Sequence, residues 1–498
     1  MHPLIPFILT LASVAAMFFP YKSGVRRHVF VFCMLLTAAA AAAVAVPALV
    51  TGVPVAWGPV RVDRFAAYVV CLVAFVAALA SLAGTHYIAH ARRDSTLSSA
   101  DERMFFSFFL LFVLSMWTAV AADNLALLWI ALESTTLTTT LLVAFDRTRG
   151  AVEAAWKYIV ICSTGITLGL LGVLMLIQSA TGAELGSGAL TLSSLSAHAG
   201  SLSAVTLQWA FVFLFIGVGT KVGFVPMHTW LPDAHSKTPS PISAMLSGIL
   251  LNVAFAVLLR VKPIVDAAIG APEWTGRLFL VFGLLSVALP TFVMLVQKNY
   301  KRMLAYSSIE HMGLMAFAAG LGPTGTLAAV IHMAGHAFAK PALFVGAGEM
   351  LHEYRSTRID EVRDVIRRRP KTAVLFFVAL LALLAAPPSA LFVSEFMMAS
   401  YGMTRHPLLT ILLLAMLAII AFGMMRSAVE MLFSSDAPAA DAHGAHAKAA
   451  APARGATERW NLANGAMLVD IILCLALGIA LLSGPGYAFF VTLSRSIS

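Results

Sequence analysis

Residues 217–243 read GVGTKVGFVPMHTWLPDAHSKTPSPIS, and this stretch decides how the rest of the chain is interpreted. It follows an apolar run, yet it carries Lys221 inside that run and interrupts the run at Pro226. Proline breaks a helix, and a charge inside an apolar membrane helix has to be paired or hydrated. The stretch therefore predicts a broken membrane helix that carries a functional charge.

The composition of the whole chain is that of a helical membrane protein. Of 498 residues, 60% are hydrophobic and 11% are charged, whereas soluble domains carry about 25% charged residues. Continuous apolar runs of roughly 20 residues fit membrane helices and not the alternating pattern of a membrane barrel. We therefore predict an all-α polytopic fold. The fourteen predicted membrane helices are residues 4–20, 27–50, 65–90, 104–122, 124–145, 156–180, 207–230, 239–261, 275–296, 303–322, 324–350, 372–402, 407–433 and 461–483.

The basic residues predict how the chain is oriented. Numbering the loops alternately places 24 lysines and arginines on one side of the membrane and 7 on the other. The positive-inside rule makes the first side cytoplasmic, so both termini are predicted to be periplasmic, in a bacterial cytoplasmic membrane. Of the 33 basic residues, Lys221 and Lys340 alone are then left inside the membrane. This distribution explains the net charge of +9 without a nucleic-acid partner.

Two segments in different halves of the chain are interrupted by proline and carry a charge. They are 207–231, with Lys221 and Pro226, and 372–402, with Pro387, Pro388 and Glu395. Paired broken helices at corresponding places in two halves point to a transporter fold with inverted repeats. Unwound backbone at each break can line a cavity and hold water, which a lipid-exposed helix cannot do.

The paired breaks predict two inverted five-helix repeats, with one break in each, and three flanking segments. Residues 352–370, before the second break, have the charge mix of a cytoplasmic amphipathic helix ended by Pro370. The predicted units are an N-terminal three-helix segment (1–100), a first repeat of helices four to eight (101–262), a second repeat of helices nine to thirteen (263–433), a flexible cytoplasmic linker (434–460) and a C-terminal helix (461–498).

The titratable residues inside the predicted helices suggest a proton relay. Glu133 lies near the middle of the fifth helix, and a pair with Lys221 would offset the cost of burying both charges. A purely structural Glu133 that fixes helix packing is the alternative. His332, His336 and Lys340 follow at i, i+4 and i+8, so they share one helical stripe. Two histidines and a lysine on one membrane stripe favour a path for protons or water.

The segment around the first break carries further polar residues. His228 lies beside Pro226 and joins the predicted relay, whereas Asp233, His235 and Lys237 are expected to be solvated loop charges. No metal site is predicted, because the histidine pair lacks a carboxylate or cysteine partner on its face. The four cysteines are too scattered to ligate zinc or an iron–sulfur cluster. We therefore expect no cofactor and no redox centre in this chain.

Four motifs carry a family resemblance over roughly residues 100–430. They resemble the proton-translocating, antiporter-like subunits shared by respiratory complex I, Mrp antiporters and membrane-bound group 4 nickel–iron hydrogenases. The similarity is strongest to the F component of hydrogenase-4. The motifs are KVGFVPMHTWLPDAHSKTPSPISAMLSG, NYKRMLAYSSIEHMG, HMAGHAFAKPALFVGAG and PPSALFVSEFM.

The resemblance implies a fourteen-helix core and assigns roles to several of these residues. Glu133 and Lys221 match the family's Glu–Lys pair on the fifth and seventh helices, and Glu395 matches the terminal acid on the twelfth. One residue departs from the pattern, because Asn252 stands where the eighth helix usually carries a connecting Lys or His. Asn cannot titrate, so a relay here would need water or the histidines of the eleventh helix.

Together these features predict a proton-translocating subunit of a multi-subunit membrane redox complex. Such a subunit is non-catalytic, lies in the lipid bilayer and works with other membrane subunits that perform the redox chemistry. The alternative is a subunit of a cation/proton antiporter, carrying Na⁺ as well as protons, or of a proton-coupled system for inorganic carbon uptake. A scaffold that has lost pumping is a third interpretation, for which Asn252 is the hint.

Overall fold

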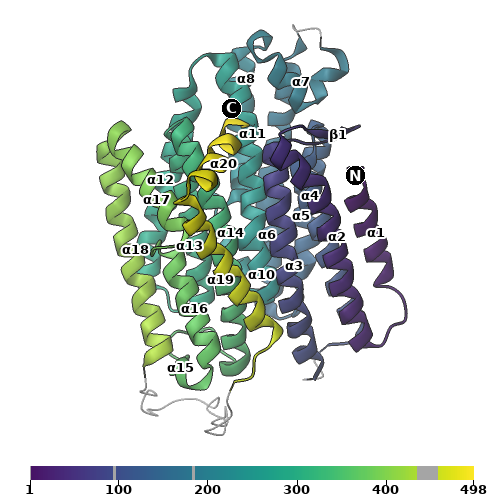
Figure 1. The fold of residues 1–498 in the computed structure, drawn as a ribbon, viewed down its shortest axis with the longest axis vertical. Helices are drawn as coiled ribbons and strands as arrows, with labels where there is room; N and C mark the ends of the chain where they lie inside the picture. Colours follow the sequence, from purple (N-terminus) through teal and green to yellow (C-terminus); the bar gives the residue numbers. More distant parts are fainter. Residues whose placement is uncertain (1, 94–96, 182–184, 435–457, 498) are drawn as a thin grey trace.

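The computed structural model describes residues 2–93, 97–181, 185–434 and 458–497. In these residues the chain forms a bundle of long helices that run roughly along one axis (Figure 1). One small hairpin, β1 (Val55–Trp57) and β2 (Val60–Val62), joins the second and third helices, with Val55 opposite Val62. Helical structure satisfies every backbone donor and acceptor within the segment, as a membrane requires.

Each of the fourteen predicted segments overlaps one or more helices of the structure. The long helices are α1 (Ile5–Ala16), α2 (Ser23–Thr51), α3 (Arg64–Arg93), α4 (Ser99–Ala121), α5 (Leu125–Val143), α6 (Arg149–Gln178), α8 (Ala204–Val222), α11 (Leu251–Ile269), α12 (Pro272–Val296), α13 (Tyr300–Gly320), α14 (Pro323–Tyr354), α16 (Pro370–Leu383), α17 (Ala390–Arg405), α18 (Pro407–Phe433) and α19 (Leu462–Leu481). The shorter elements are η2 (Gly186–Leu190), α7 (Leu192–Ala197), η3 (Ala199–Ser201), α9 (Trp230–Lys237), α10 (Ser240–Met245), η4 (Leu246–Leu250), α15 (Val365–Arg368) and α20 (Gly484–Arg495).

Eleven helical segments of the described chain are long and apolar enough to cross a membrane, with Ser240–Ile269 counted as one. The protein is therefore a polytopic helical membrane protein. Helices α1 and α16 are shorter, at 12 and 14 residues, and α13 carries Glu310 and His311 as well as two basic residues in its first turn. The count of fourteen spans and the inverted repeats stay predictions.

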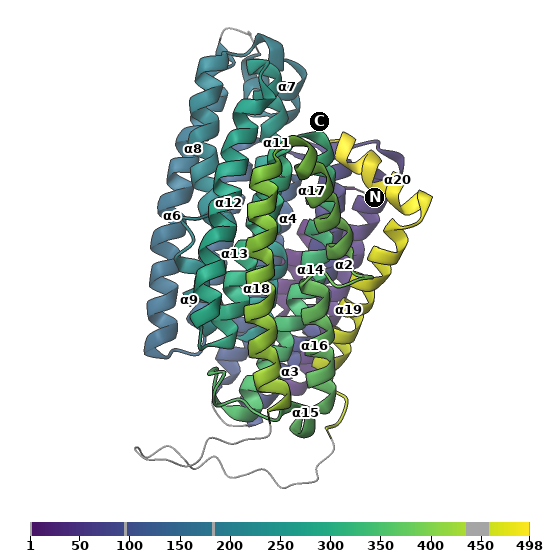
Figure 2. The same ribbon diagram turned by 90° about the vertical axis from the view of Figure 1, so that its left-hand side faces the viewer.

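The centre of the bundle is formed by helices that are covered on all sides. The membrane-length windows of Ser240–Ile269 and α14 are fully buried within the chain, whereas only a third of that of α18 is buried. Figure 2 shows α6 and α8 on one flank, α13 and α14 further in, and α17 beyond them. Polar side chains on the inner helices are thus kept away from lipid by the protein itself.

Both proline-containing segments are interrupted helices. Helix α8 ends at Val222, because Gly223 adopts a left-handed conformation with φ of +87°. A non-helical stretch containing Pro226 follows, and α9 then begins at Trp230. The second interruption spans residues 384–389 between α16 and α17 and contains both Pro387 and Pro388. Each break therefore places non-helical backbone within the bundle.

The predicted amphipathic helix at 352–370 is wrong. Helix α14 ends at Tyr354, and Pro370 begins α16 instead of ending a helix. The segment between them pairs with the start of α13. The Tyr300 backbone N–H donates to the Thr357 carbonyl at 3.0 Å, and the Ile359 N–H donates to the Lys298 carbonyl at 2.9 Å. These strand-like bonds satisfy the backbone without a helix, and proline is well suited to a helical first turn.

The two described ends of the chain lie at the same end of the bundle, opposite α15 (Figures 1 and 2). Which side of the membrane this end faces stays a prediction. Residues 435–457, most of the predicted linker, lie outside the described residues.

Candidate functional site

Lys221 lies in the last turn of α8 and is fully buried. Its Nζ donates to the hydroxyl of Thr136 on α5 at 2.8 Å and to the hydroxyl of Tyr158 on α6 at 2.7 Å. The ammonium also lies 4.9 Å from the centroid of the Tyr158 ring, a cation–π distance. Three helices therefore hold this charge.

The close approach of α6 and α8 positions Lys221 against Tyr158. A Cβ atom on Gly217 would lie 2.5 Å from the backbone nitrogen of Gly169, so the two backbones touch at this point. Small residues that let backbones approach are the usual basis of helix packing in membranes. A side chain at Gly217 would force the helices apart and move the lysine from its hydroxyl partners.

Glu133 lies on α5, one turn before Thr136. Its Oε1 accepts a hydrogen bond from Ser163 at 2.6 Å, and its Oε2 is buried without a hydrogen-bond partner among the described residues. No carboxylate of the described chain lies within 4 Å of Lys221 Nζ. The hydroxyls of Thr136 and Tyr158, and not Glu133 itself, hold the ammonium. Glu133 and Lys221 are neighbours in one cluster and do not form a contact ion pair.

Helix α9 connects this cluster with the centre of the bundle. Trp230 donates its indole N–H to the Thr220 carbonyl at 2.9 Å, and its ring centroid lies 4.9 Å from that of Tyr158. At the other end of α9, the ring of His235 lies 5.6 Å from Phe344 on α14. His235 is fully buried, so its interpretation as a solvated loop charge is wrong. Its Nε2 has no hydrogen-bond partner among the described residues.

His228 lies within the non-helical stretch before α9. It is 7% exposed, and its Nδ1 has no hydrogen-bond partner in the part of the chain that the structure describes. Pro226 lies two residues earlier in the same stretch. The break thus holds a buried imidazole with a free ring nitrogen.

Lys340 is a further fully buried lysine, and it turns toward α13. Its Nζ donates to the Leu304 carbonyl at 2.9 Å and to the Ser307 hydroxyl. One turn further along α13, Glu310 and His311 are both buried, with His311 Nε2 lying 3.6 Å from a carboxylate oxygen of Glu310. A lysine, a carboxylate and an imidazole therefore meet between α13 and α14.

A chain of histidines continues from α13 through α14 to α17. His311 Nδ1 lies 2.9 Å from His332 Nε2, and His332 Nδ1 lies 3.0 Å from the Ser394 hydroxyl. The ring of His336 lies 5.4 Å from that of His311, and both its nitrogens lack hydrogen-bond partners among the described side chains and backbone. Glu395 follows Ser394 on α17. Imidazoles that share a hydrogen bond can pass a proton between them.

The same side chains also offer ligands for a metal ion. One donor atom each from His311, His332 and Glu395 lie within 4.8 Å of one another. Two imidazoles and a carboxylate are donors that Zn²⁺ accepts. The sequence of α14 offered no carboxylate on the face that carries its histidines. In the structure, α17 supplies that carboxylate as Glu395, and α13 supplies the second imidazole as His311.

Asn252 fastens α11 to α14 beside the histidine chain. Its side-chain amide donates to the Gly248 carbonyl at 2.9 Å and to the Met333 carbonyl at 3.1 Å. Gly248 belongs to η4, a π-helical turn between α10 and α11. The amide oxygen of Asn252 has no hydrogen-bond partner in the described residues. The residue therefore joins α11 to the backbone of α14 without adding a group that titrates.

Sequence reasoning missed several polar residues that the structure buries, among them Lys301, which the count of basic loop residues had placed in water. Glu310 and His311 lie within one of the family motifs, and an adjacent acid and imidazole inside an apolar run is the signal that singles them out. Asp470 lies in the middle of an apolar run and carries the same kind of signal. His235 carries no such signal, because nothing in its local sequence separates a buried helix from a loop.

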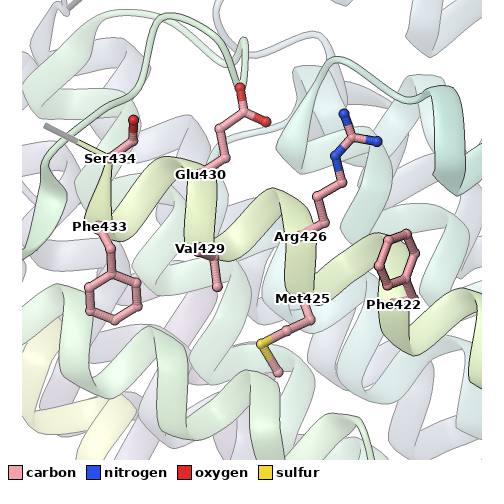
Figure 3. A pocket seen from close by; sticks show the side chains of 7 residues that line it. All are labelled: Phe422, Met425, Arg426, Val429, Glu430, Phe433 and Ser434. Atoms are coloured by element: carbon pink, nitrogen blue, oxygen red, sulfur yellow. The ribbon is translucent and has the colours of Figure 1, made fainter. Parts of the chain in front are cut away.

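An open hollow lies away from these residues, on the outer face of α18. Its volume is about 550 Å³, and Figure 3 shows the side chains around it. They are Phe422, Met425, Arg426, Val429, Glu430, Phe433 and Ser434. Because it contains no member of the buried clusters, it is not part of the candidate site.

Residues 122–421 match the family described as NADH:quinone oxidoreductase/Mrp antiporter, transmembrane. The chain belongs to this family. It is an antiporter-like membrane subunit, related to those of complex I, Mrp and hydrogenase-type complexes. The matched residues include every member of the two buried clusters, from Glu133 to Glu395.

Curated relatives of this antiporter-like subunit come from several kinds of membrane complex. It is 36% identical to the hydrogenase-4 component F homolog of Methylacidiphilum infernorum over 351 residues, which cover 70% of this chain and 73% of the relative. It is 31% identical to NADH-quinone oxidoreductase subunit N of Ruthia magnifica over 64% of this chain and 65% of the relative. It is 29% identical to hydrogenase-4 component B of Escherichia coli over 67% of this chain, but spans only about half (49%) of that relative.

Solved structures share the fold over nearly the whole length of the antiporter-like subunit. A chain of the membrane-bound sulfane sulfur reductase, an archaeal respiratory complex, has a TM-score of 0.82 at 22% identity, covering 99% of this chain and 96% of that one. A chain of respiratory complex I from Thermus thermophilus has a TM-score of 0.75 at 23% identity, with 98% of each chain covered. A chain of the Mrp complex from Dietzia has a TM-score of 0.78 at 18% identity, with 99% and 97% covered.

Proposed function

We propose that this chain moves protons across a bacterial cytoplasmic membrane as one subunit of a multi-subunit complex whose redox chemistry takes place in partner subunits. The observation that carries the proposal is the succession of buried proton-carrying groups across the bundle, from Glu133 and Lys221 through Lys340 and the histidines to Glu395. Buried ionisable groups are costly in a membrane and mark ion or proton paths.

Lys221 is the central carrier in this proposal. Its hydroxyl partners Thr136 and Tyr158 can accept from the ammonium but leave it without a counter-charge in contact. The state of nearby Glu133 therefore decides how stable the ammonium is: an ionised Glu133 favours it, and a protonated Glu133 favours release. Lysine suits this role, because a buried lysine shifts its proton affinity readily.

The proton then crosses to the second cluster. The imidazole of His235 on α9 lies between Trp230 and Phe344, and its free Nε2 offers a relay point with the help of water. Lys340 and His336 receive the proton on α14, and the His311–His332 pair carries it to α17. Glu395 exchanges it with the outside of the chain. His228 carries protons within the non-helical stretch that follows Lys221.

The two ends of this succession support a position within a larger assembly. Glu133 on α5 and Glu395 on α17 are both only partly covered by the chain itself, whereas the groups between them are fully buried. Neighbouring membrane subunits would cover both carboxylates and continue the path. Homologous chains in complex I, Mrp and the sulfane sulfur reductase are parts of such assemblies.

The experiment that tests the proposal is Lys221→Ala in the complex purified with its native partners and reconstituted into vesicles. We expect coupled proton movement to be lost while the complex assembles and its redox chemistry continues. Lys22→Ala is the matched control, because Lys22 is exposed at the end of α2. Unchanged proton movement in Lys221→Ala vesicles would refute the assignment of Lys221 as carrier.

The exchange of Na⁺ or the uptake of inorganic carbon is the alternative use of the same fold. The lysines of the clusters favour protons, because an ammonium group has no acceptor with which to bind Na⁺ but can give up a proton. The same vesicles distinguish these functions. An imposed Na⁺ gradient drives proton movement only in an exchanger, and bicarbonate dependence appears only in a carbon-uptake system.

A further inference from the structure

Asp470 is a buried carboxyl that the relay described above does not use. It lies near the middle of α19 and is 1% exposed, and its Oδ1 has no hydrogen-bond partner among the described residues. An unpaired acid inside a membrane helix is costly, so its presence calls for a function or a neutralising contact. The Asp470 side chain does not face lipid, because other helices of the chain cover it.

The face of α19 that carries Asp470 packs against α14. Met467 and Cys474 lie three residues before and four residues after Asp470, so all three share one face of the helix. A Cβ on Gly346 of α14 would lie 2.7 Å from the Met467 side chain, and Cys474 Sγ lies 3.8 Å from the Gly335 carbonyl. Asp470 therefore faces α14 at a depth between Gly335 and Gly346, the depth of Lys340.

The same helix packs directly on the second break. Gly478 lies two turns beyond Asp470, and a Cβ on it would clash with the Pro388 carbonyl oxygen and the backbone of Ser389. The glycine thus lets α19 press against the unwound stretch 384–389. Unwound backbone inside a membrane protein can hold water, and the buried carboxyl lies on the approach to it.

Toward the α15 end of the bundle, α19 carries further polar groups on its covered side. Asn464 donates to the Thr372 hydroxyl at 3.1 Å, and its amide oxygen has no hydrogen-bond partner among the described residues. Asn461, just before the helix, donates to Glu349 at 2.9 Å. His86 lies 3.4 Å from Glu349 and is 18% exposed, so this group reaches the surface.

We propose that Asp470 is a proton-carrying residue that supplies the second broken helix from the α15 end of the bundle, separately from Lys221. The carboxyl O–H bond breaks as its proton passes to water at the 384–389 stretch and on to Glu395. The bond forms again with a proton that arrives past Glu349 and Asn464. This inference rests on the proposed function, because it adds a second supply to the same proton path.

A purely structural role is the competing explanation. A permanently protonated Asp470 could donate to a backbone carbonyl and fasten α19, with no proton transfer. Asn separates the two roles, because its amide keeps a donor of similar shape and cannot release a proton under these conditions. Glu keeps the titrating group with one more methylene. A structural role is preserved by Asn, and a carrier role is preserved only by Glu.

The experiment compares Asp470→Asn, Asp470→Glu and wild type in the purified complex reconstituted into vesicles. We expect Asp470→Asn to assemble and melt as wild type but to lose proton movement by about tenfold or more. Asp470→Glu should retain most of the movement, with a displaced pH profile. Asp360→Asn, in the exposed loop before α15, is the matched control. Infrared difference spectra should lose a carboxyl signal in Asp470→Asn.

The outcomes also separate this inference from the proposed function. If Lys221→Ala stops proton movement and Asp470→Asn leaves it unchanged, the role of Asp470 is refuted and the proposed function stands. If Asp470→Asn and Asp470→Glu are equally impaired and both melt at lower temperature, Asp470 is structural and the inference fails. If wild-type vesicles move no protons during redox turnover, the proposed function fails first.

Discussion

The two broken helices of this chain carry opposite charges on opposite sides of the break. At the first break a lysine precedes the interruption, and its partners are the hydroxyls of Thr136 and Tyr158. At the second break an acid, Glu395, follows the interruption, and its neighbours are the imidazoles of His311 and His332. The same device of an interrupted helix thus serves two different proton chemistries.

The helix ends explain part of this difference. Lys221 lies in the last turn of α8, where the negative end of the helix dipole stabilises a cation. Glu395 lies in the second turn of α17, beyond the reach of the dipole at its N-terminus. The first group is therefore controlled by its helix and its hydroxyls. The second depends on titrating neighbours, and this makes the two clusters respond differently to substitution.

The largest expected effect comes from Lys221→Arg. Arginine keeps the positive charge and the hydrogen bonds to Thr136 and Tyr158, but it cannot be deprotonated in a protein. We expect proton movement to fall by about 100-fold or more, the scale on which positioned proton-transfer groups act. Proton uptake into vesicles, measured with a pH-sensitive dye during redox turnover, gives the rate. If this variant still moved protons at a substantial rate, Lys221 would act only through its charge. The two breaks would then not differ in the way that we propose.

A smaller effect is expected from His332→Gln in the second cluster. Gln can keep a hydrogen bond to Ser394 or to His311, but it cannot carry the proton between them. His336 is nearby with both ring nitrogens free of partners among the described residues, so part of the flux can pass around the substituted residue. We expect about a tenfold loss in the same vesicle assay.

The exposed His28 on α2 provides the control, as His28→Gln. The double variant of His332 and His336 should lose proton movement far more than either single variant, if the two histidines are parallel routes. If His332→Gln lost as much proton movement as Lys221→Arg, the second cluster would offer a single proton route, as the first cluster does.

Zinc provides a reversible test of the second cluster. The donor atoms of His311, His332 and Glu395 lie close enough together to bind one Zn²⁺ ion, whereas Lys221 is surrounded by hydroxyls and has no such set among the described residues. We expect micromolar Zn²⁺ to slow proton movement severalfold and a chelator to restore it. His332→Gln should weaken the inhibition, and Mg²⁺ should not inhibit. Inhibition that persists unchanged in His332→Gln would place the zinc elsewhere.

Family membership and a mostly helical, polytopic membrane fold could be predicted from the sequence, and both are confirmed. The reason is physical: apolar runs of membrane length leave helices as the available structure, and Lys221 in an apolar run is hard to explain in any other class. The roles of the individual relay residues stay predictions.

What the sequence could not reveal depends on contacts between segments distant along the chain. The interpretation of 352–370 as a helix was wrong, because backbone bonds to residues 298–300 replaced helical ones. His235 was expected in water but is covered, since α9 packs against α6 and α13 and the His235 ring lies against Phe344 of α14. Likewise, the His311–His332 contact joins residues 21 positions apart on different helices. Periodicity within one helix carries no information about such meetings.

The smallest effect is expected at Asn252, the residue between the two clusters that departs from the family pattern. Asn252→Leu removes the amide bonds to the Gly248 and Met333 carbonyls. In a membrane such side-chain bonds average about 0.6 kcal/mol each, so stability should fall by about 1 kcal/mol. We expect proton movement to change by less than about twofold, because an amide carries no titrating proton.

Thermal melting of the purified complex and the vesicle assay together decide this prediction. Gly465→Ala on α19 is a suitable control, since an added methyl group meets nothing within 4 Å there. A loss of transport much larger than the loss of stability would mean that the free amide oxygen of Asn252 holds water for the relay. Protons would then pass between the two clusters through α11 as well as through α9, and Asn252 would be part of the relay.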